Sequence, residues 1–125
     1  MAVIGLGMDV CSVERIARVL AGPNGARFRA RVYTPGEIAT CEGRSEAATA
    51  YAARFAAKEA LVKALGAPAG LRWQDMEVLR AASGAPTFAL TGVAAREVAA
   101  RRARVLLALT HDGGVAAATV VLDAA

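Results

Sequence analysis

The chain has 125 residues, of which 56% are hydrophobic and 21% charged, and its formal net charge is +4. This length fits a single domain over residues 1–125, and this hydrophobicity excludes an intrinsically disordered chain. About a quarter of the residues are alanine and 5% are aromatic, so we expect a thin core with few large side chains. A thin core of this kind favours oligomerisation.

Export and membrane insertion have no signal in the sequence. Two cysteines, Cys11 and Cys41, are too few for a disulfide framework and match no zinc motif. The N-terminus lacks a basic export segment, and no uncharged apolar run reaches the roughly 18–20 residues that cross a bilayer. We therefore expect a soluble cytoplasmic protein with reduced thiols and no contact with a membrane.

The hydrophobic pattern predicts an α+β fold with a buried strand first, a long central helix, and antiparallel strands at the end. Strands are predicted over residues 2–10, 76–81, 87–90, 105–110 and 115–122. Helices are predicted over residues 13–20, 26–32, from 35 onward, 46–65 and 92–102.

Local signals mark the ends of several of these helices. Ser12 and Thr91 are expected as N-caps, and Thr34 with Glu37 has the spacing of a capping box. Gly66, at the end of the longest predicted helix, is expected as its C-terminal cap.

Charged residues in the central helix need a reason, because this helix is apolar nearly all round and should be buried. Glu59 either pairs with Lys63 on a solvated surface or, with Asp9, belongs to a Mg²⁺–phosphate site. Asp9 lies at the C-terminal end of a predicted buried strand, where it either caps the next helix or faces a ligand. The sequence spacing leaves both alternatives open.

Arginines form a second feature, because five of them lie between residues 15 and 31 with no acid among them. A cluster of one sign favours an anionic partner: nucleic acid, an acidic protein or a phosphorylated small molecule. A nucleic-acid-binding module or a Mg²⁺-dependent nuclease is one alternative, although Phe28 alone could stack on bases there. A non-catalytic trimeric binding protein is another, and a solvated arginine-rich face is the simplest reading.

Taken in order, the motifs resemble those of the small holo-acyl-carrier-protein synthases over essentially the whole chain. They are Gly7-Met8-Asp9, Arg15-Ile16, Phe28, Arg31, Thr34, Glu37, the block Ala53-Arg54-Phe55-Ala56-Ala57-Lys58-Glu59-Ala60, Lys63 to Gly66, Asp75 to Val78, Gly84 to Pro86, Leu90 to Gly92 and Leu109 to His111. The Arg54–Ala60 block carries most of the specificity. Ala108 departs from the pattern, since many relatives have serine there.

The resemblance implies a 4′-phosphopantetheinyl transferase fold that assembles as a homotrimer with active sites at the subunit interfaces. It implies transfer of 4′-phosphopantetheine from coenzyme A (CoA) to a serine of an apo acyl carrier protein in fatty-acid or polyketide biosynthesis. The reaction would need Mg²⁺ and release 3′,5′-ADP.

The resemblance also assigns residues. Asp9 and Glu59 would hold Mg²⁺ and, with Lys63, carry the catalysis. The residues expected around CoA are Arg44, Arg54, Lys63, Gly66, Pro86, Thr110 and His111. The residues expected to dock the carrier protein are Arg15, Ile16, Val19, Arg27, Phe28 and Arg31.

Overall fold

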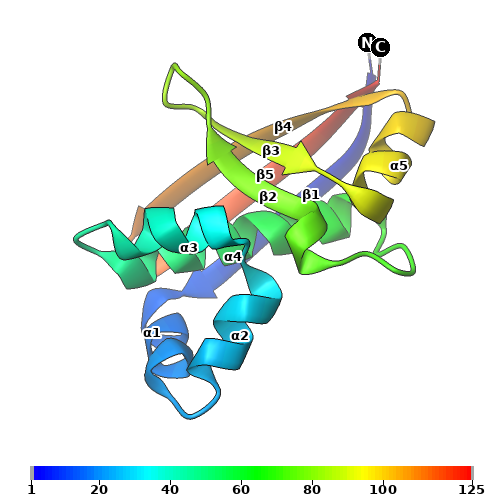
Figure 1. Cartoon of the computed structure of the whole chain (residues 1–125). Coiled ribbons are helices and arrows are strands. Elements are labelled where there is room, and N and C mark those ends of the chain that lie inside the picture. Colours follow the sequence, from blue (N-terminus) through cyan, green and yellow to red (C-terminus); the bar gives the residue numbers. More distant parts are fainter. Residues whose placement is uncertain (1, 125) are drawn as a thin grey trace.

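The computed structural model describes residues 2–124, and its elements follow the predicted order, so the α+β class is confirmed (Figure 1). The strands are β1 (Ala2–Ser12), β2 (Met76–Arg80), β3 (Pro86–Leu90), β4 (Ala103–Asp112) and β5 (Val115–Ala124). The helices are α1 (Val13–Ala21), α2 (Gly25–Val32), α3 (Pro35–Glu42), α4 (Ala47–Leu65), the 3-10 helix η1 (Trp73–Asp75) and α5 (Gly92–Ala100).

Two antiparallel sheets make up the β structure of residues 2–124. Three long strands run side by side in the order β1-β5-β4, and the β2–β3 hairpin forms a separate sheet in front of them in Figure 1. The tight turn between β4 and β5 places Gly113 and Gly114 at φ of 56° and 81°, a conformation that glycine adopts without strain.

Helix α4 is the centre of the molecule. It packs on β1 and β5, while α1, α3 and β2 contact its other sides. Gly7 lets the strand and the helix approach closely, because a Cβ at this position would lie 1.8 Å from the Ala60 carbonyl oxygen. The helix presents fully buried alanines, including Ala52, Ala56 and Ala57, which agrees with the thin core expected from composition.

One face of the three-stranded sheet is uncovered, which corrects the prediction that the first strand is buried. Leu6, Met8 and Val10 on β1 are 64%, 59% and 58% exposed, and Leu106 on β4 is 44% exposed. The register places these residues on the face away from α4; with their neighbours they form what we call the open sheet face. It consists of Leu6, Met8, Val10, Leu106, Ala108, Thr110, Ala117, Thr119 and Val121.

Most of the capping predictions are confirmed. The Ser12 side chain accepts from the Arg15 N–H, Thr34 and Glu37 form the capping box, and Gly66 ends α4 at φ 75°. Thr91 is the exception, because its hydroxyl donates to Asp75 Oδ1 (3.1 Å) instead of capping α5. Helix α5 also ends at Ala100, two residues earlier than predicted.

Two further findings concern the cysteines and the helices. Cys11 and Cys41 are free and buried. Of the helices described, none combines the length and the hydropathy that crossing a bilayer requires.

Candidate active site

Asp9 and Lys63 meet where β1 crosses α4. Lys63 Nζ lies 3.1 Å from Asp9 Oδ1 and also donates to the Met8 carbonyl at 2.9 Å. The Asp9 side chain is 16% exposed and the Lys63 side chain 52% exposed, so the pair is open to a ligand. Asp9 does not cap α1, since Ser12 does.

Glu59 lies one helical turn before Lys63, on the same face of α4. Burial raises the pKa of the Glu59 carboxyl, the Asp9 carboxylate raises it further, and the Lys63 ammonium opposes both effects. Lys63 forms its ion pair with Asp9, so the simple helix-surface pairing of Glu59 with Lys63 is not what the structure contains. Two carboxylates therefore repel each other at a site with one lysine, an arrangement that a cation would stabilise.

These donors fit Mg²⁺. Hard cations prefer carboxylate oxygens, and Mg²⁺ is usually held by one or two carboxylates together with water and substrate phosphate. Within residues 2–124 no group of three or more His, Cys, Asp or Glu side chains is placed to hold a metal ion. Asp9 and Glu59 supply two carboxylates and leave the other positions to ligands.

A cavity of about 400 Å³ lies between the start of α4 and the end of β4. Four of the residues expected around CoA line it, namely Arg44, Arg54, Thr110 and His111. Arg54 is 4% exposed, and its Nε has no hydrogen-bond partner within the described residues, while one terminal nitrogen donates to the Ala50 carbonyl (3.3 Å). A buried guanidinium with an unsatisfied N–H is stabilised by an anion in the cavity.

Arg80 also lines this cavity, although the sequence motifs did not predict a role for it. It ends β2, and its guanidinium donates to the Gly84 carbonyl at 2.8 Å. No local pattern distinguishes it from any exposed arginine near a hairpin turn. The other residues expected around CoA, which are Lys63, Gly66 and Pro86, lie outside the lining of the cavity.

A smaller cavity of about 290 Å³ lies directly beside Glu59. Apart from Glu59 its lining is apolar: Val62, Ala67, Pro68, Leu71, Trp73 and Met76. Trp73 stacks on Phe55 (ring centroids 5.5 Å apart), and Phe55 packs on Phe28 (5.9 Å), so aromatic rings connect α2 with this cavity.

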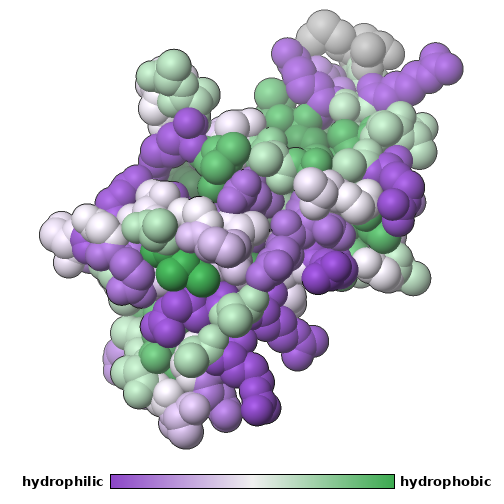
Figure 2. All heavy atoms as spheres, viewed as in Figure 1, coloured by the Kyte–Doolittle hydropathy of each residue, from purple (hydrophilic) through white to green (hydrophobic). Residues whose placement is uncertain are grey.

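The arginines of α1 and α2 divide into two groups. Arg18 pairs with Glu14 (3.9 Å) and Arg29 with Glu42 (3.6 Å). The remaining three, which are Arg15, Arg27 and Arg31, are exposed and form no ion pair within residues 2–124. Figure 2 shows strongly hydrophilic side chains at the lower end of the molecule, where Figure 1 places α1 and α2.

The expected docking residues are not all accessible. Val19 is 37% exposed and Phe28 is partly buried, but Ile16 is 3% exposed and packs in the core. Ile16 is therefore removed from the expected docking set, because helical periodicity turns it toward the core. We call the exposed and partly buried members of this set the basic face: Arg15, Val19, Arg27, Phe28 and Arg31.

Comparison with known proteins decides the family. The family model described as the 4′-phosphopantetheinyl transferase superfamily matches residues 5–120. The chain belongs to this superfamily. It is 63% identical over 123 residues to the holo-[acyl-carrier-protein] synthase of Myxococcus xanthus (strain DK1622), covering 98% of this chain and 97% of that one.

Solved structures of the superfamily share the fold. The holo-ACP-synthase of Plasmodium yoelii superposes with a TM-score of 0.84 and 26% identity, covering 99% of this chain and 97% of that one. The Helicobacter pylori holo-[acyl-carrier-protein] synthase in complex with coenzyme A superposes with a TM-score of 0.79 and 27% identity, covering 94% and 99%. The family resemblance seen in the sequence is thereby confirmed.

Proposed function

We propose that this chain transfers 4′-phosphopantetheine from CoA to a serine hydroxyl of an apo acyl carrier protein. The observation that carries the proposal is the meeting of Asp9, Glu59 and Lys63 at the crossing of β1 and α4, on a chain 63% identical to a holo-[acyl-carrier-protein] synthase. The serine oxygen attacks the phosphorus that bears pantetheine. The phosphoanhydride bond breaks, and 3′,5′-ADP leaves with the bonding electrons.

Each charged residue of the site has a distinct role in this proposal. Glu59 accepts the serine proton, directly or through water, and its raised pKa brings its basicity closer to what that transfer needs. Lys63 places its ammonium where negative charge develops on the breaking phosphoanhydride. Asp9 and Glu59 would hold Mg²⁺, which when bound supplies further positive charge against the pyrophosphate.

The arginine-lined cavity is assigned to the nucleotide end of CoA. The phosphate groups of CoA would accept hydrogen bonds from the unsatisfied N–H of Arg54 and from the guanidinium of Arg44. Thr110 and His111 supply neutral hydrogen-bonding groups. Gly66 and Pro86 would contact CoA outside this cavity.

A homotrimer with active sites between subunits is part of the proposal, and two features support it. The open sheet face is a large exposed apolar surface of the kind that marks a protein interface. In addition, the arginine-lined cavity includes neither Asp9, Glu59 nor Lys63 in its lining. In the trimer, the cavity of one subunit would lie next to the Asp9 and Glu59 carboxylates of its neighbour.

The basic face is assigned to the acidic carrier protein. The alternative of a nucleic-acid-binding module or nuclease gains no support, because Phe28 packs against Tyr33 and Phe55 and is not free to stack on bases. The cytoplasmic location and the choice between fatty-acid and polyketide carriers stay predictions.

The function is tested by incubating an apo carrier protein with CoA, Mg²⁺ and this protein, followed by mass spectrometry of the carrier. We expect a mass increase of one phosphopantetheine group on the carrier serine and the appearance of 3′,5′-ADP. An unmodified carrier under conditions in which the Myxococcus xanthus relative modifies it would contradict the proposal.

Arg15→Glu is expected to raise KM for the carrier protein by about five- to tenfold and to leave KM for CoA unchanged, because rim charges steer association. Salt should weaken the wild-type interaction, since exposed charges are screened over about 8 Å at physiological ionic strength. Initial rates at several salt concentrations measure both effects. Arg96→Glu is the control, an equal charge reversal on exposed α5; equal effects of both variants would remove Arg15 from the docking surface.

A further inference from the structure

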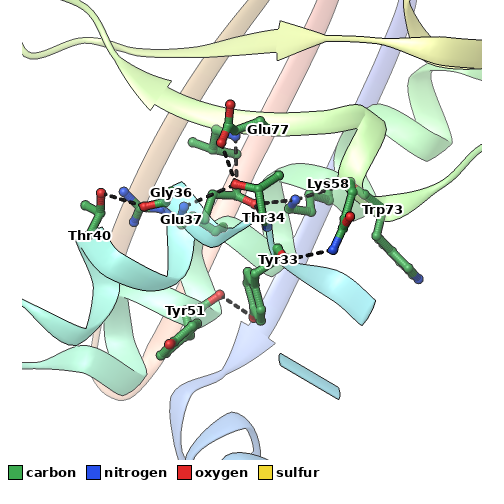
Figure 3. Close-up of polar contacts among 12 residues, drawn as sticks. Tyr33, Thr34, Gly36, Glu37, Thr40, Tyr51, Lys58, Trp73 and Glu77 are labelled. Atoms are coloured by element: carbon green, nitrogen blue, oxygen red, sulfur yellow. Dashed lines mark hydrogen bonds and ion pairs between the residues drawn. The ribbon is translucent and has the colours of Figure 1, made fainter. Parts of the chain in front are cut away.

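Lys58 is a buried lysine in the residue just before Glu59. Its side chain is 0% exposed, and its ammonium donates to Glu37 Oε1 at 2.7 Å and to the Trp73 carbonyl at 3.1 Å. Figure 3 shows Lys58 extending from α4 toward α3 and the loop of Trp73. The reaction described above does not use this lysine.

Glu37 gathers hydrogen bonds from several elements onto one carboxylate (Figure 3). Besides Lys58, its Oε1 accepts from the Thr34 N–H (3.0 Å) and its Oε2 from the Val78 N–H (2.9 Å). Thr34 in turn donates its hydroxyl to Glu77 on β2. A single buried ion pair thus joins α4 to α3, β2 and η1.

Hydrophobic burial defines the rotation of α4 about its axis only in part. An amphipathic helix is oriented by its apolar stripe, but α4 is buried on nearly all sides, and five of its ten buried residues are alanines. Its large buried apolar side chains are Tyr51, Leu61 and Leu65, and a small rotation would otherwise exchange alanine surfaces of similar size and polarity. A polar group that has its partners in only one orientation can supply the missing specificity.

Lys58 and Glu59 are consecutive, so their side chains leave the helix about 100° apart. Lys58 points to Glu37, whereas Glu59 lies on the same face of α4 as Lys63, one turn later, whose ammonium pairs with Asp9. Any rotation that moved Glu59 away from Asp9 would pull the Lys58 ammonium from the Glu37 carboxylate.

We propose that the Lys58–Glu37 pair sets the rotation of α4 and thereby aims the Glu59 carboxylate at Asp9 and Lys63. Both are positioning residues, which act through Glu59 and touch no substrate. The inference rests on the proposed function for the role of Glu59, and it adds two residues that the reaction needs without using them chemically.

The test removes both charges together, because either single neutralisation leaves the other charge buried without its partner. In the double variant Lys58→Met with Glu37→Gln, methionine fills the space of the lysine chain, and glutamine keeps an oxygen for a backbone N–H. We expect the variant to fold but to lose about tenfold or more in kcat, the scale of misplaced catalytic groups, with KM for the carrier within about twofold.

Metal binding gives a readout that is independent of turnover. Mn²⁺ replaces Mg²⁺ as a paramagnetic probe, and its affinity is measured by electron paramagnetic resonance with the metal alone. We expect about a tenfold weaker Mn²⁺ affinity in the double variant, the usual scale for losing a group that orients a metal ligand. If the wild type binds Mn²⁺ but modifies no carrier, the proposed function fails. The Mn²⁺ affinities of the wild type and the double variant still test whether the Lys58–Glu37 pair positions the Glu59 carboxylate.

Leu61→Ala is the matched control, because Leu61 is fully buried on the same helix and its truncation destabilises the fold without touching the pair. Well below both unfolding midpoints, Leu61→Ala is expected to keep wild-type kcat and Mn²⁺ affinity. Wild-type values of both in a folded double variant would overturn the proposal.

A second variant decides the matter should the double variant not fold. Glu37→Asp retains the charge pair but shortens the carboxylate arm by one methylene, so Lys58 and α4 must shift to keep contact. We expect a folded protein with reduced kcat and weaker Mn²⁺ binding. Unchanged values would overturn the proposal, and so would loss of the fold in both variants, because the pair would then hold the fold together and not aim one side chain.

Discussion

Glu59→Gln and Asp9→Asn are each expected to lower kcat for transfer by about 100-fold or more, the scale of losing one well-placed group that stabilises a transition state. Each amide keeps the shape of the carboxylate but lacks the charge that a hard cation requires, and glutamine at position 59 cannot accept the serine proton. Carrier modification is followed by mass spectrometry at saturating Mg²⁺, and the fold by circular dichroism.

Glu97→Gln is the control for this pair, because Glu97 lies on α5, is ion-paired with Arg101, and lines none of the cavities described. We expect it to retain wild-type kcat. Glu59→Gln should also be no less stable than the wild type, since burial and Asp9 disfavour the ionised Glu59 in the folded protein. A transfer rate near wild type in either site variant would rule out the proposed carboxylate pair.

The pH dependence of kcat/KM should reflect the ionisation of the Glu59 carboxyl. Its pKa is raised, so Glu59 in the free enzyme takes up a proton at a higher pH than an ordinary glutamate does. The ionised form accepts the serine proton and holds the cation, so the rate is expected to rise with pH through this pKa. Rate profiles at low and high Mg²⁺ test the assignment: the acidic limb should move to lower pH as Mg²⁺ increases, and a limb insensitive to Mg²⁺ would assign it to another group.

Local signals in the sequence predicted local structure well. Ser12, the Thr34–Glu37 capping box and Gly66 each act within a few residues of their own helix end, and all three are as predicted. Thr91 failed because a distant side chain, that of Asp75, offers its hydroxyl a hydrogen bond from outside the helix. A cap predicted from sequence takes account only of the residues at its own helix end.

The site required more than local signals. Asp9 and Lys63 are 54 residues apart in sequence; residue types alone left a shared Mg²⁺–phosphate site as one alternative, and the family motifs were needed to assign it. The Lys58–Glu37 pair and the turn of Arg80 into the arginine-lined cavity depend on how α4, α3 and β2 pack, which no spacing encodes. The first strand was expected to be buried because it is apolar on both faces, yet a single chain covers just one of them.

The open sheet face is the surface that we expect to lie between subunits. Leu6→Glu combined with Leu106→Glu is expected to convert a trimer into monomers and to abolish transfer at assay concentration. In the single chain Leu6 and Leu106 are already exposed, so the fold should survive, whereas charges buried between subunits without partners oppose assembly. Light scattering measures the mass, and the transfer assay is run on the same samples.

Leu79→Glu is the matched control. Leu79 is 43% exposed, close to the 44% of Leu106, but it lies on β2 outside the open sheet face. It should remain trimeric and active. A fully active monomer, either wild type or variant, would show that one chain holds a complete site.

Mixing Glu59→Gln with Arg54→Gln, each expected to be inactive alone, separates a shared site from mere stabilisation by assembly. Glu59→Gln lacks a carboxylate, and Arg54→Gln lacks the buried guanidinium of the cavity. If the cavity of one subunit works with the carboxylates of its neighbour, random reassembly of equal amounts should restore about one quarter of the interfaces in a cyclic oligomer. Sites contained within one chain would recover nothing, because every subunit would still carry one of the two lesions.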